Sequence, residues 1–459
     1  MPMRTLLYNK GVLPSDAYAA LRHPFVRSFA IGRFAAIAGW QMINVAVGWQ
    51  LYERTGDAWA LGLVGVAELT PVLFLMVVAG NAADRYPRRN IGIFAHTVLT
   101  FAASGLALLS WLNGPTWAIY SLLFMVGTAR AFASPSVNTI LPQLLAPAEF
   151  ANANAWLSST FQLAAITGPA AGGMLIAATG AATLPFAVAA IGQLIFIVML
   201  RTMPVRVSAS ARTDSSELRR DRAEAAFGRE GGPPPSSSRR STSEIFAGFR
   251  FVRQNPLFLS AITLDLFAVL FGGAVALLPI YAKDILQVGP AGLGYLRAAP
   301  GIGALSMALI TTRLRPWKRP GLVLLWVVAG FGLATIGFGL SRSFALSLFC
   351  LFLTGVFDNI SVVIRLTLEQ TITPDHLRGR VSAINYVFIG FSNEFGAFES
   401  GATAALFGPT LSVIGGGFAT LMVVLLVRAV WPQLARIGPL HTLTAAESLS
   451  AVALAEAER

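Results

Sequence analysis

Several charged residues interrupt long apolar stretches, where each would be costly in lipid and therefore marks a candidate site. Glu68, Asp265 and Asp358 lie roughly ten residues or more inside their stretches. A carboxyl group in an apolar cavity favours its neutral form and can load and release a proton near neutral pH, so these acids are the candidates for proton coupling. Asp358 and Arg365 share a helix face about 10 Å apart along the axis, so each is expected to have its partner on another helix.

Basic and polar residues in the same stretches are candidates for the cavity and the substrate. Arg33, Trp40 and Asn44 fall on one face of a helix, because spacings of seven and eleven residues are near whole turns. Arg130 and Arg365 lie in two other stretches. These arginines can act as counter-charges to the acids or bind an anionic group of a substrate.

Other chemistry finds no support in the sequence. The four histidines and the single cysteine, Cys350, are scattered without metal-ligand spacing, so we expect no metal and no cofactor. No G-x-x-x-x-G-K-S/T loop occurs, which excludes ATP-driven pumping by this chain. We expect no enzymatic activity.

The elements that hold these residues are predicted to be membrane-spanning helices. The 459 residues are 55% hydrophobic and only 12% charged, which is too few charges to cover soluble domains. A spanning helix needs about 20 mostly apolar residues, and twelve stretches qualify, which predicts an all-α polytopic membrane protein. The predicted spans are 26–52, 58–82, 91–112, 116–144, 151–179, 182–203, 256–282, 291–312, 321–341, 344–370, 379–407 and 409–431.

A polar segment divides these spans into two sets of six. Residues 204–243 are rich in Ser, Pro, Gly and Arg and cannot bury a core. The following SEIFAGFRFVRQN predicts a short amphipathic helix on the membrane surface, with Ile245, Phe246, Phe249 and Val252 on its apolar face. The predicted organisation is an N-terminal tail (1–25), a six-helix half (26–203), a linker with the surface helix (204–255), a second six-helix half (256–431) and a C-terminal tail (432–459).

The formal net charge of +12 is explained by topology. Residues 201–253 contain eleven arginines against six acids, and the loops on the opposite side are poor in Lys and Arg. We therefore expect both termini in the cytoplasm, with the basic loops against anionic membrane lipids. Nucleic acid is not an expected partner, because no reader motif accompanies the scattered arginines.

The two halves carry matching landmarks at one offset. Gly127 and Gly355 are 228 residues apart, and Pro71 and Pro300 are 229 apart. Two glycines of the fifth span recur in the eleventh, also 228 residues later. A repeat of six spans in the same orientation predicts a pseudo-two-fold axis along the membrane normal.

Two short motifs indicate a gate and a bend. In GNAADRYPRR (80–89) the acid can accept charge-assisted hydrogen bonds and hold the two halves together, although a role in topology alone is the alternative. In GPAAGG (168–173) the proline and glycines bend the helix and let another helix approach. The candidate residues are Gly80, Asp84, Arg85, Arg88 and Arg89 for the gate and Gly168, Pro169, Gly172 and Gly173 for the bend.

With these motifs the sequence resembles the major facilitator superfamily over nearly its whole length. GNAADRYPRR resembles its loop signature G-x-x-x-D-R-x-G-R-R, with Pro87 in place of a glycine. GPAAGG resembles the signature of its antiporters, with Ala164 in place of the first glycine. TITPDHLRGRVSAIN (371–385) and NEFGAFESG (393–401) are similar to an exporter branch that includes the bacterial enterobactin exporter.

The resemblance implies two halves that rock around a central cavity lined mainly by spans 1, 4, 7 and 10. We therefore predict a monomer in the bacterial cytoplasmic membrane that exports a small organic molecule, such as a siderophore, drug or similar metabolite, by proton antiport with alternating access. A lipid or lysolipid translocator of the same fold and a non-transporting membrane scaffold or sensor are the alternatives.

Overall fold

The computed structural model describes residues 18–137, 139–145, 147–203, 249–314, 316–374 and 377–439. These residues form twelve helices of 16 residues or more and contain no strand. The predictions for the tail before Tyr18, the linker residues 204–248 and the tail from residue 440 onward lie outside the described residues.

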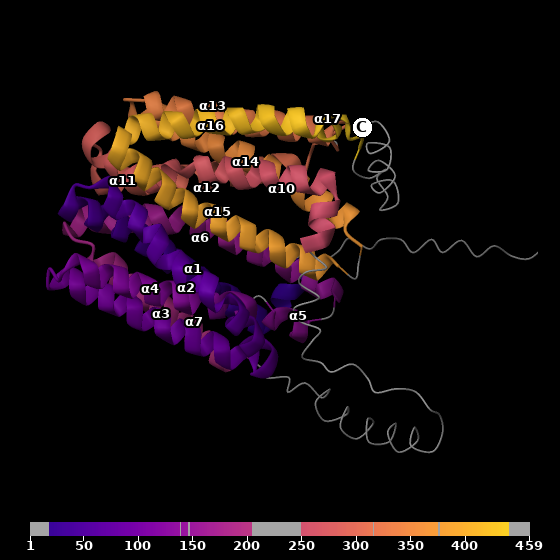
Figure 1. The fold of residues 1–459 in the computed structure, drawn as a ribbon. Helices are drawn as coiled ribbons and strands as arrows, with labels where there is room; N and C mark the ends of the chain where they lie inside the picture. Colours follow the sequence, from indigo (N-terminus) through magenta and orange to yellow (C-terminus); the bar gives the residue numbers. More distant parts are fainter. Residues whose placement is uncertain are drawn as a thin grey trace, which may run out of the picture.

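The first half of the chain forms six long helices (Figure 1). They are α1 (Pro24–Thr55), α2 (Ala58–Arg85), α3 (Arg88–Trp111), α4 (Thr116–Val137), α6 (Pro147–Thr179) and α7 (Thr183–Thr202), with the short η1 (Ala20–Arg22) before α1 and α5 (Ile140–Leu144) before α6. The predicted span 116–144 agrees with the apolar stretch Thr116–Pro142, within which α4 is described to Val137 and α5 begins at Ile140.

The second half repeats this arrangement. Its elements are α10 (Pro256–Phe271), η2 (Gly273–Leu277), α11 (Leu278–Ile280), η3 (Tyr281–Ile285), α12 (Gly289–Thr311), α13 (Pro320–Leu340), α14 (Phe344–Ile372), α15 (Arg378–Phe407), α16 (Pro409–Val430) and α17 (Pro432–Arg436). The predicted span 256–282 agrees with the apolar stretch Pro256–Ile285, but the helix within it is irregular. Its regular helix ends at Phe271, and Gly273 lies so close to α15 that a side chain there would meet the Gly396 carbonyl oxygen at 2.6 Å.

Eleven spans of the described chain are long and apolar enough to cross a membrane. The remaining long helix, α15, has sufficient length but carries Asn385, Asn393, Glu394 and Glu399. The pattern confirms an all-α, multi-pass membrane protein.

The surface helix predicted after the linker is described only over residues 249–254. Phe249 is exposed there, as predicted, but Val252 is 3% exposed and packs with Phe258, Ile262 and Val381. The prediction that this apolar face lies on lipid is therefore wrong at Val252, because α10 and α15 cover it.

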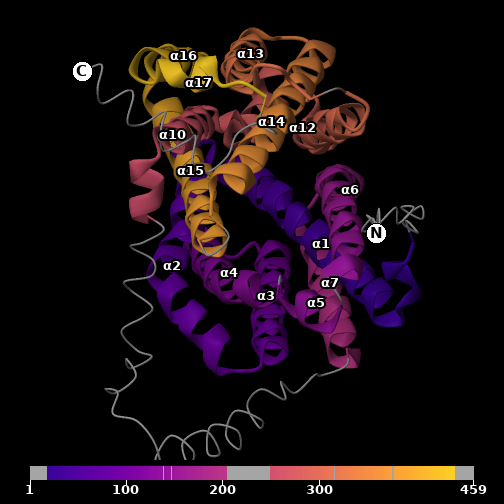
Figure 2. The ribbon, with the colours of Figure 1, turned by 90° about the vertical axis from the view of Figure 1, so that its right-hand side faces the viewer.

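The two halves meet along two helix pairs, α2 with α15 and α6 with α12. Figure 2 looks along the bundle from the end where residues 203 and 249 lie, hereafter the linker end, and shows the two halves above and below one another. At the opposite end, hereafter the far end, α1 gives way to α2.

The two ends of the bundle differ in how the halves pack. One buried apolar cluster at the far end combines residues of both halves, such as Ile43 and Leu61 with Leu277 and Leu296. At the linker end the corresponding clusters contain residues of a single half each. Buried apolar side chains of the two halves thus pack against one another at the far end. At the linker end, those of each half pack only among themselves in these clusters.

Contacts between glycine and proline support the predicted repeat. A side chain on Gly127 of α4 would collide with the Glu68 carbonyl oxygen and lie 2.7 Å from Cγ of Pro71 on α2. A side chain on Gly355 of α14 would collide with the carbonyl oxygen of Pro300 on α12. The α2–α4 contact of the first half and the α12–α14 contact of the second half therefore form at equivalent glycine and proline positions.

Candidate functional site

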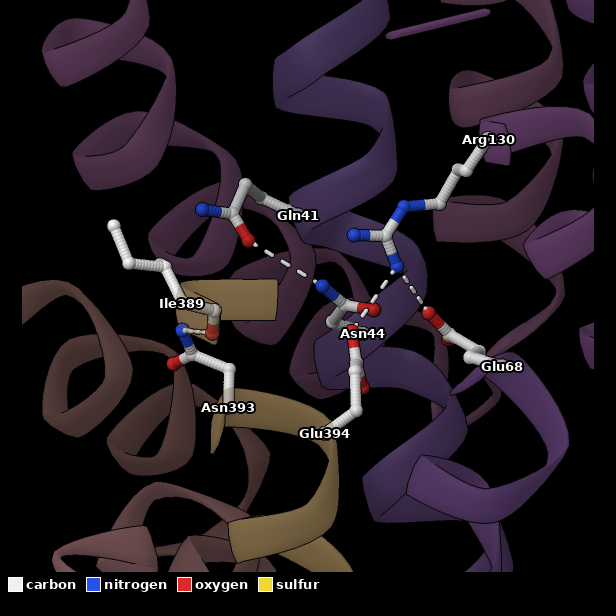
Figure 3. Close-up of polar contacts among 7 residues, drawn as sticks. All are labelled: Gln41, Asn44, Glu68, Arg130, Ile389, Asn393 and Glu394. Atoms are coloured by element: carbon white, nitrogen blue, oxygen red, sulfur yellow. Dashed lines mark hydrogen bonds and ion pairs between the residues drawn. The ribbon is translucent and has the colours of Figure 1, made fainter. Parts of the chain in front are cut away.

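A group of charged side chains occupies the middle of the bundle around Arg130 of α4 (Figure 3). Its Nη1 atom donates to Oε2 of Glu68 on α2 at 2.6 Å and to Oε1 of Glu394 on α15 at 3.2 Å. The Glu68 side chain is 4% exposed, whereas those of Arg130 and Glu394 are 32% and 24% exposed. One nitrogen therefore joins a buried acid of its own half to a more accessible acid of the other half.

Two further residues, Trp40 and Arg297, lie around this group. The Arg130 guanidinium lies over the Trp40 ring of α1, 4.4 Å from the ring centroid, in cation–π geometry. Arg297 of α12 is within electrostatic range of Glu68 and Glu394. Two arginines thus face two glutamates, a balance that a low-dielectric interior strongly favours over an unpaired charge.

The local packing explains why Glu68 reaches Arg130. Gly127 lies one turn before Arg130 on α4, and its missing side chain allows the backbone of α2 at Glu68 to touch α4. The carboxylate and the guanidinium therefore start from backbones in direct contact. Arg130 and Trp40 were predicted for the cavity and Glu68 for proton coupling, and the structure brings all three together.

The other two residues predicted on the Trp40 face, Asn44 and Arg33, have other described neighbours. Asn44 Nδ2 donates to Gln41 Oε1 at 3.4 Å, beside the Arg130 group (Figure 3). Arg33 lies about 10 Å from Trp40 along α1 and is within electrostatic range of His96, itself bonded to Gln193 in the first half.

A second charged group lies within the second half. Arg365 of α14 forms an ion pair with Asp265 of α10, both with side chains about nine-tenths buried. Ser361 Oγ accepts from Arg365 Nε at 3.2 Å. Asp358 is exposed and interacts with this pair only electrostatically. The prediction that Arg365 takes its partner from another helix is confirmed, and the partner is Asp265.

The far end carries a polar contact between the halves. The Tyr52 hydroxyl of α1 donates to Oδ2 of Asp284 in η3, and Lys283 Nζ lies 5.7 Å from the centre of the Tyr52 ring. Residues 281–285 form a π-helical turn, and Gln287 has a φ of 54°. This uncommon backbone directs Asp284 toward the first half.

The GNAADRYPRR motif lies where α2 ends and α3 begins, at the linker end. Pro87 has a φ of −56° at the N-cap of α3, a value that suits proline, so its replacement of a glycine leaves the turn intact. Arg89 donates to the backbone carbonyl of Arg201 in α7. Gly80 faces open space, and Arg85 is exposed while Arg88 is half-buried. The side chain of Asp84 is outside the described part, and the Arg89 contact lies within the first half.

The GPAAGG motif places α6 between α1 and α12. A side chain on Gly168 would lie 2.7 Å from the Ala38 carbonyl oxygen of α1, and one on Gly172 would lie 3.2 Å from Met42 Cα. One on Gly173 would lie 2.8 Å from Gly294 Cα of the other half, whose own added side chain would lie 2.7 Å from the Pro169 carbonyl oxygen. The motif therefore packs against α1 within the first half and against α12 of the second half. This packing surface of residues 168–173 is hereafter called the GPAAGG seam.

Sequence reasoning missed three residues of these groups. Glu394 and Arg297 lie within the predicted spans 379–407 and 291–312, but neither is predicted as part of the site. Asp284 was not considered. The repeat offered a signal for Glu394. If the two halves are equivalent, the eleventh span, which carries Glu394, packs on the second span as the fifth packs on the eighth.

The family model described as the Major Facilitator Superfamily matches residues 29–397. The chain belongs to this superfamily. The Enterobactin exporter EntS of Escherichia coli O1:K1 / APEC is 29% identical over 418 residues, which cover 90% of this chain and 93% of that protein. The protein of the same name from Shigella boydii serotype 18 (strain CDC 3083-94 / BS512) is similar to the same extent.

Solved transporters of the superfamily share the fold. The nucleoside transporter NupG is 12% identical with a TM-score of 0.64 and covers 89% of this chain and 99% of that one. A bacterial homologue of the human lysosomal transporter Spinster, in an inward-facing and unoccupied conformation, is 14% identical with a TM-score of 0.65 and covers 93% and 98%. At these identities the likeness establishes the arrangement of helices.

Proposed function

We propose that this protein exports a small organic molecule from the cytoplasm in exchange for protons, by alternating access. The observation that carries the proposal is the position of Arg130 between Glu68 of one half and Glu394 of the other. A proton on Glu394 removes its negative charge and weakens its bond to Arg130, so proton binding and contact between the halves are linked.

The direction of transport follows from the similarity to exporters and from the charge of the loops. The linker end is the basic end, and we assign it to the cytoplasm of a bacterial inner membrane, with both termini inside. In this assignment the structure receives substrate from the cytoplasm, because its halves are closed at the far end and separate at the linker end. A single chain supplies both sides of the charged group, so we assign the active form to a monomer.

The remaining candidates receive roles on the same basis. Asp265 and Arg365 neutralise one another within the second half and hold α10 to α14. Asp358, Asn44 and Arg33 offer polar contacts to a substrate in the cavity, and residues 80–89 close the linker end in the opposite state. The GPAAGG seam keeps the first half tight against α12.

The test is proton-driven uptake into inside-out membrane vesicles with an acidic lumen. Enterobactin is the first probe because the relatives are named for it, and a panel of siderophores, amphipathic drugs and lysolipids follows. We expect accumulation of at least one compound that collapses with a protonophore. The Glu394→Gln variant should lose it at least tenfold, whereas Glu399→Gln, on the same helix, should retain it. Accumulation that survives the protonophore, or an active Glu394→Gln variant, would contradict the proposal.

A further inference from the structure

The carboxylate of Glu394 reaches Arg130 because α15 lies directly on α2 at one residue, Gly65. A methyl group on Gly65 would collide with the backbone carbonyl oxygen of Glu394 itself. The same methyl group would lie 3.3 Å from Cβ of Ala397, one turn further along α15. Gly65 therefore touches the residue that carries the acid, at its backbone.

The contact continues over the preceding turn of α2. A side chain on Gly62 would lie 3.1 Å from the Phe398 carbonyl oxygen and 3.2 Å from Gly401 Cα. Two successive turns of α2 thus accept the backbone of α15 without an intervening side chain. Gly62 and Gly65 of α2 therefore set how closely α15 approaches α2.

Glu68 lies one turn after Gly65 on the same helix. The two acids that share the Arg130 nitrogen are thereby held at a defined separation, Glu68 by its own helix and Glu394 by the contact of its backbone with that helix. The Arg130 to Glu394 distance of 3.2 Å leaves little slack, because hydrogen bonds weaken steeply when donor and acceptor move apart.

We propose that Gly65 is a positioning residue for proton coupling, setting the reach of Glu394 to Arg130 through the separation of α2 and α15. The inference rests on the proposed function where transport is measured. It does not rest on it where the distance between the two halves is measured. Gly65 bears no charge and contacts no substrate in this account, so its effect is exerted through Glu394.

The other seam between the halves supplies a matched control. Gly294 of α12 is also too crowded for a side chain, although less so than Gly65, since an added side chain would lie 2.7 Å from the Pro169 carbonyl oxygen, and the described contact carries no ion pair. Gly415 of α16 faces open space and controls for the loss of a glycine in a helix.

The experiment is a double-mutant cycle in reconstituted full-length protein. Gly65→Ala, Gly294→Ala and Gly415→Ala are each made in the wild-type and Glu394→Gln backgrounds. Two properties are measured: proton-driven uptake of a compound that the wild type transports, and the pH dependence of the distance between spin labels at Asn90 and Lys318, which lie exposed at the linker ends of the two halves.

Gly65→Ala should reduce uptake at least tenfold and suppress the pH dependence of the distance in the wild type, but change each less than twofold further in Glu394→Gln. Gly294→Ala should reduce uptake by a similar factor in both backgrounds, and Gly415→Ala should be neutral. Equal effects of Gly65→Ala in both backgrounds, or wild-type behaviour, would overturn the inference.

Failure of the proposed function and failure of the Gly65 inference give different results in this experiment. If Glu394→Gln transports like the wild type, the proposed function fails, and Gly65 is then judged on the distance measurement alone. If Gly65→Ala does not fold, Ala397→Val crowds the same contact from the side of α15 and must show the same dependence on Glu394. An effect of Ala397→Val that is equal in both backgrounds overturns the inference.

Discussion

Arg130 of α4 and Glu394 of α15 are 264 residues apart in the sequence and 3.2 Å apart in the structure. They come from different halves of the chain and meet in the middle of the bundle, beside Glu68 and Trp40. In the proposed function, this ion pair links the charge state of Glu394 to the relative position of the halves.

Removing the charge of Glu68 should separate its role from that of Glu394. Glu68→Gln leaves Arg130 with Glu394 as its remaining acid, which strengthens the link between the halves and slows their separation. We expect uptake into inside-out vesicles to fall at least tenfold while expression and folding persist. Transport at the wild-type rate over pH 6–8 would refute this role.

The ion pair of Asp265 with Arg365 should matter chiefly for stability. Asp265→Asn leaves a buried guanidinium without its counter-charge, and breaking such a pair costs about 3–5 kcal/mol. The thermal unfolding temperature in detergent should fall by several degrees. The double variant Asp265→Leu with Arg365→Met, which removes both charges, should recover much of it. An unchanged unfolding temperature for Asp265→Asn would contradict the assignment.

The bond of Tyr52 to Asp284 should bias the protein toward closure of the far end. Tyr52→Phe removes a hydrogen bond to a charged group between the halves, a contribution of about 1.5–3 kcal/mol. That is roughly a tenfold or greater shift in a two-state equilibrium. Labelling of a cysteine placed in the cavity by a membrane-impermeant reagent from the far side should increase accordingly.

Tyr120→Phe is the matched control for that prediction. Its hydroxyl donates to the Ala60 carbonyl oxygen at 2.9 Å, near the same end but within the first half. The control loses a hydrogen bond of the same residue type without releasing the other half. Equal labelling of the two variants would show that Tyr52 has no special role in closure.

The GPAAGG seam should tolerate no large side chain. Gly168→Leu cannot be accommodated, because even its Cβ would lie 2.7 Å from the Ala38 carbonyl oxygen of α1. We expect export to be lost, whereas Gly415→Leu, in open space on α16, should transport normally. Coupled efflux by Gly168→Leu in proteoliposomes would contradict this role.

Much of the fold could be predicted because lipid imposes a simple pattern. Apolar length and the polar segment at 204–243 define the spans and their two sets, and the repeat of Gly127 and Gly355 anticipates equivalent helix contacts. The end of the regular helix at Phe271 could not be predicted in this way. Hydropathy is continuous from Pro256 to Ile285, and at Gly273 the break follows from contact with α15, which lies far along the chain.

The site was predicted in part for a similar reason. The cost of a charge in lipid identifies Glu68, Arg130 and Arg365 one at a time, but it does not say which charges meet. Partners such as Glu394 for Arg130 and Asp284 for Tyr52 lie more than 230 residues away. Their pairing is set by the docking of the two halves, which no local spacing encodes.

The most direct test of the account is the pH dependence of the distance between spin labels at Asn90 and Lys318, measured without substrate. Cys350, the single cysteine, is replaced by serine so that labels attach at the two sites alone. A proton taken up by the Arg130 group removes one of its negative charges and weakens the link between the halves, so the population closed at the linker end should grow at lower pH. The distance should therefore shorten between pH 8.5 and pH 5.5 in the otherwise unaltered protein and stay constant in Glu394→Gln. The same shortening in both proteins would contradict the central claim that the Arg130–Glu394 pair couples protons to the movement of the halves.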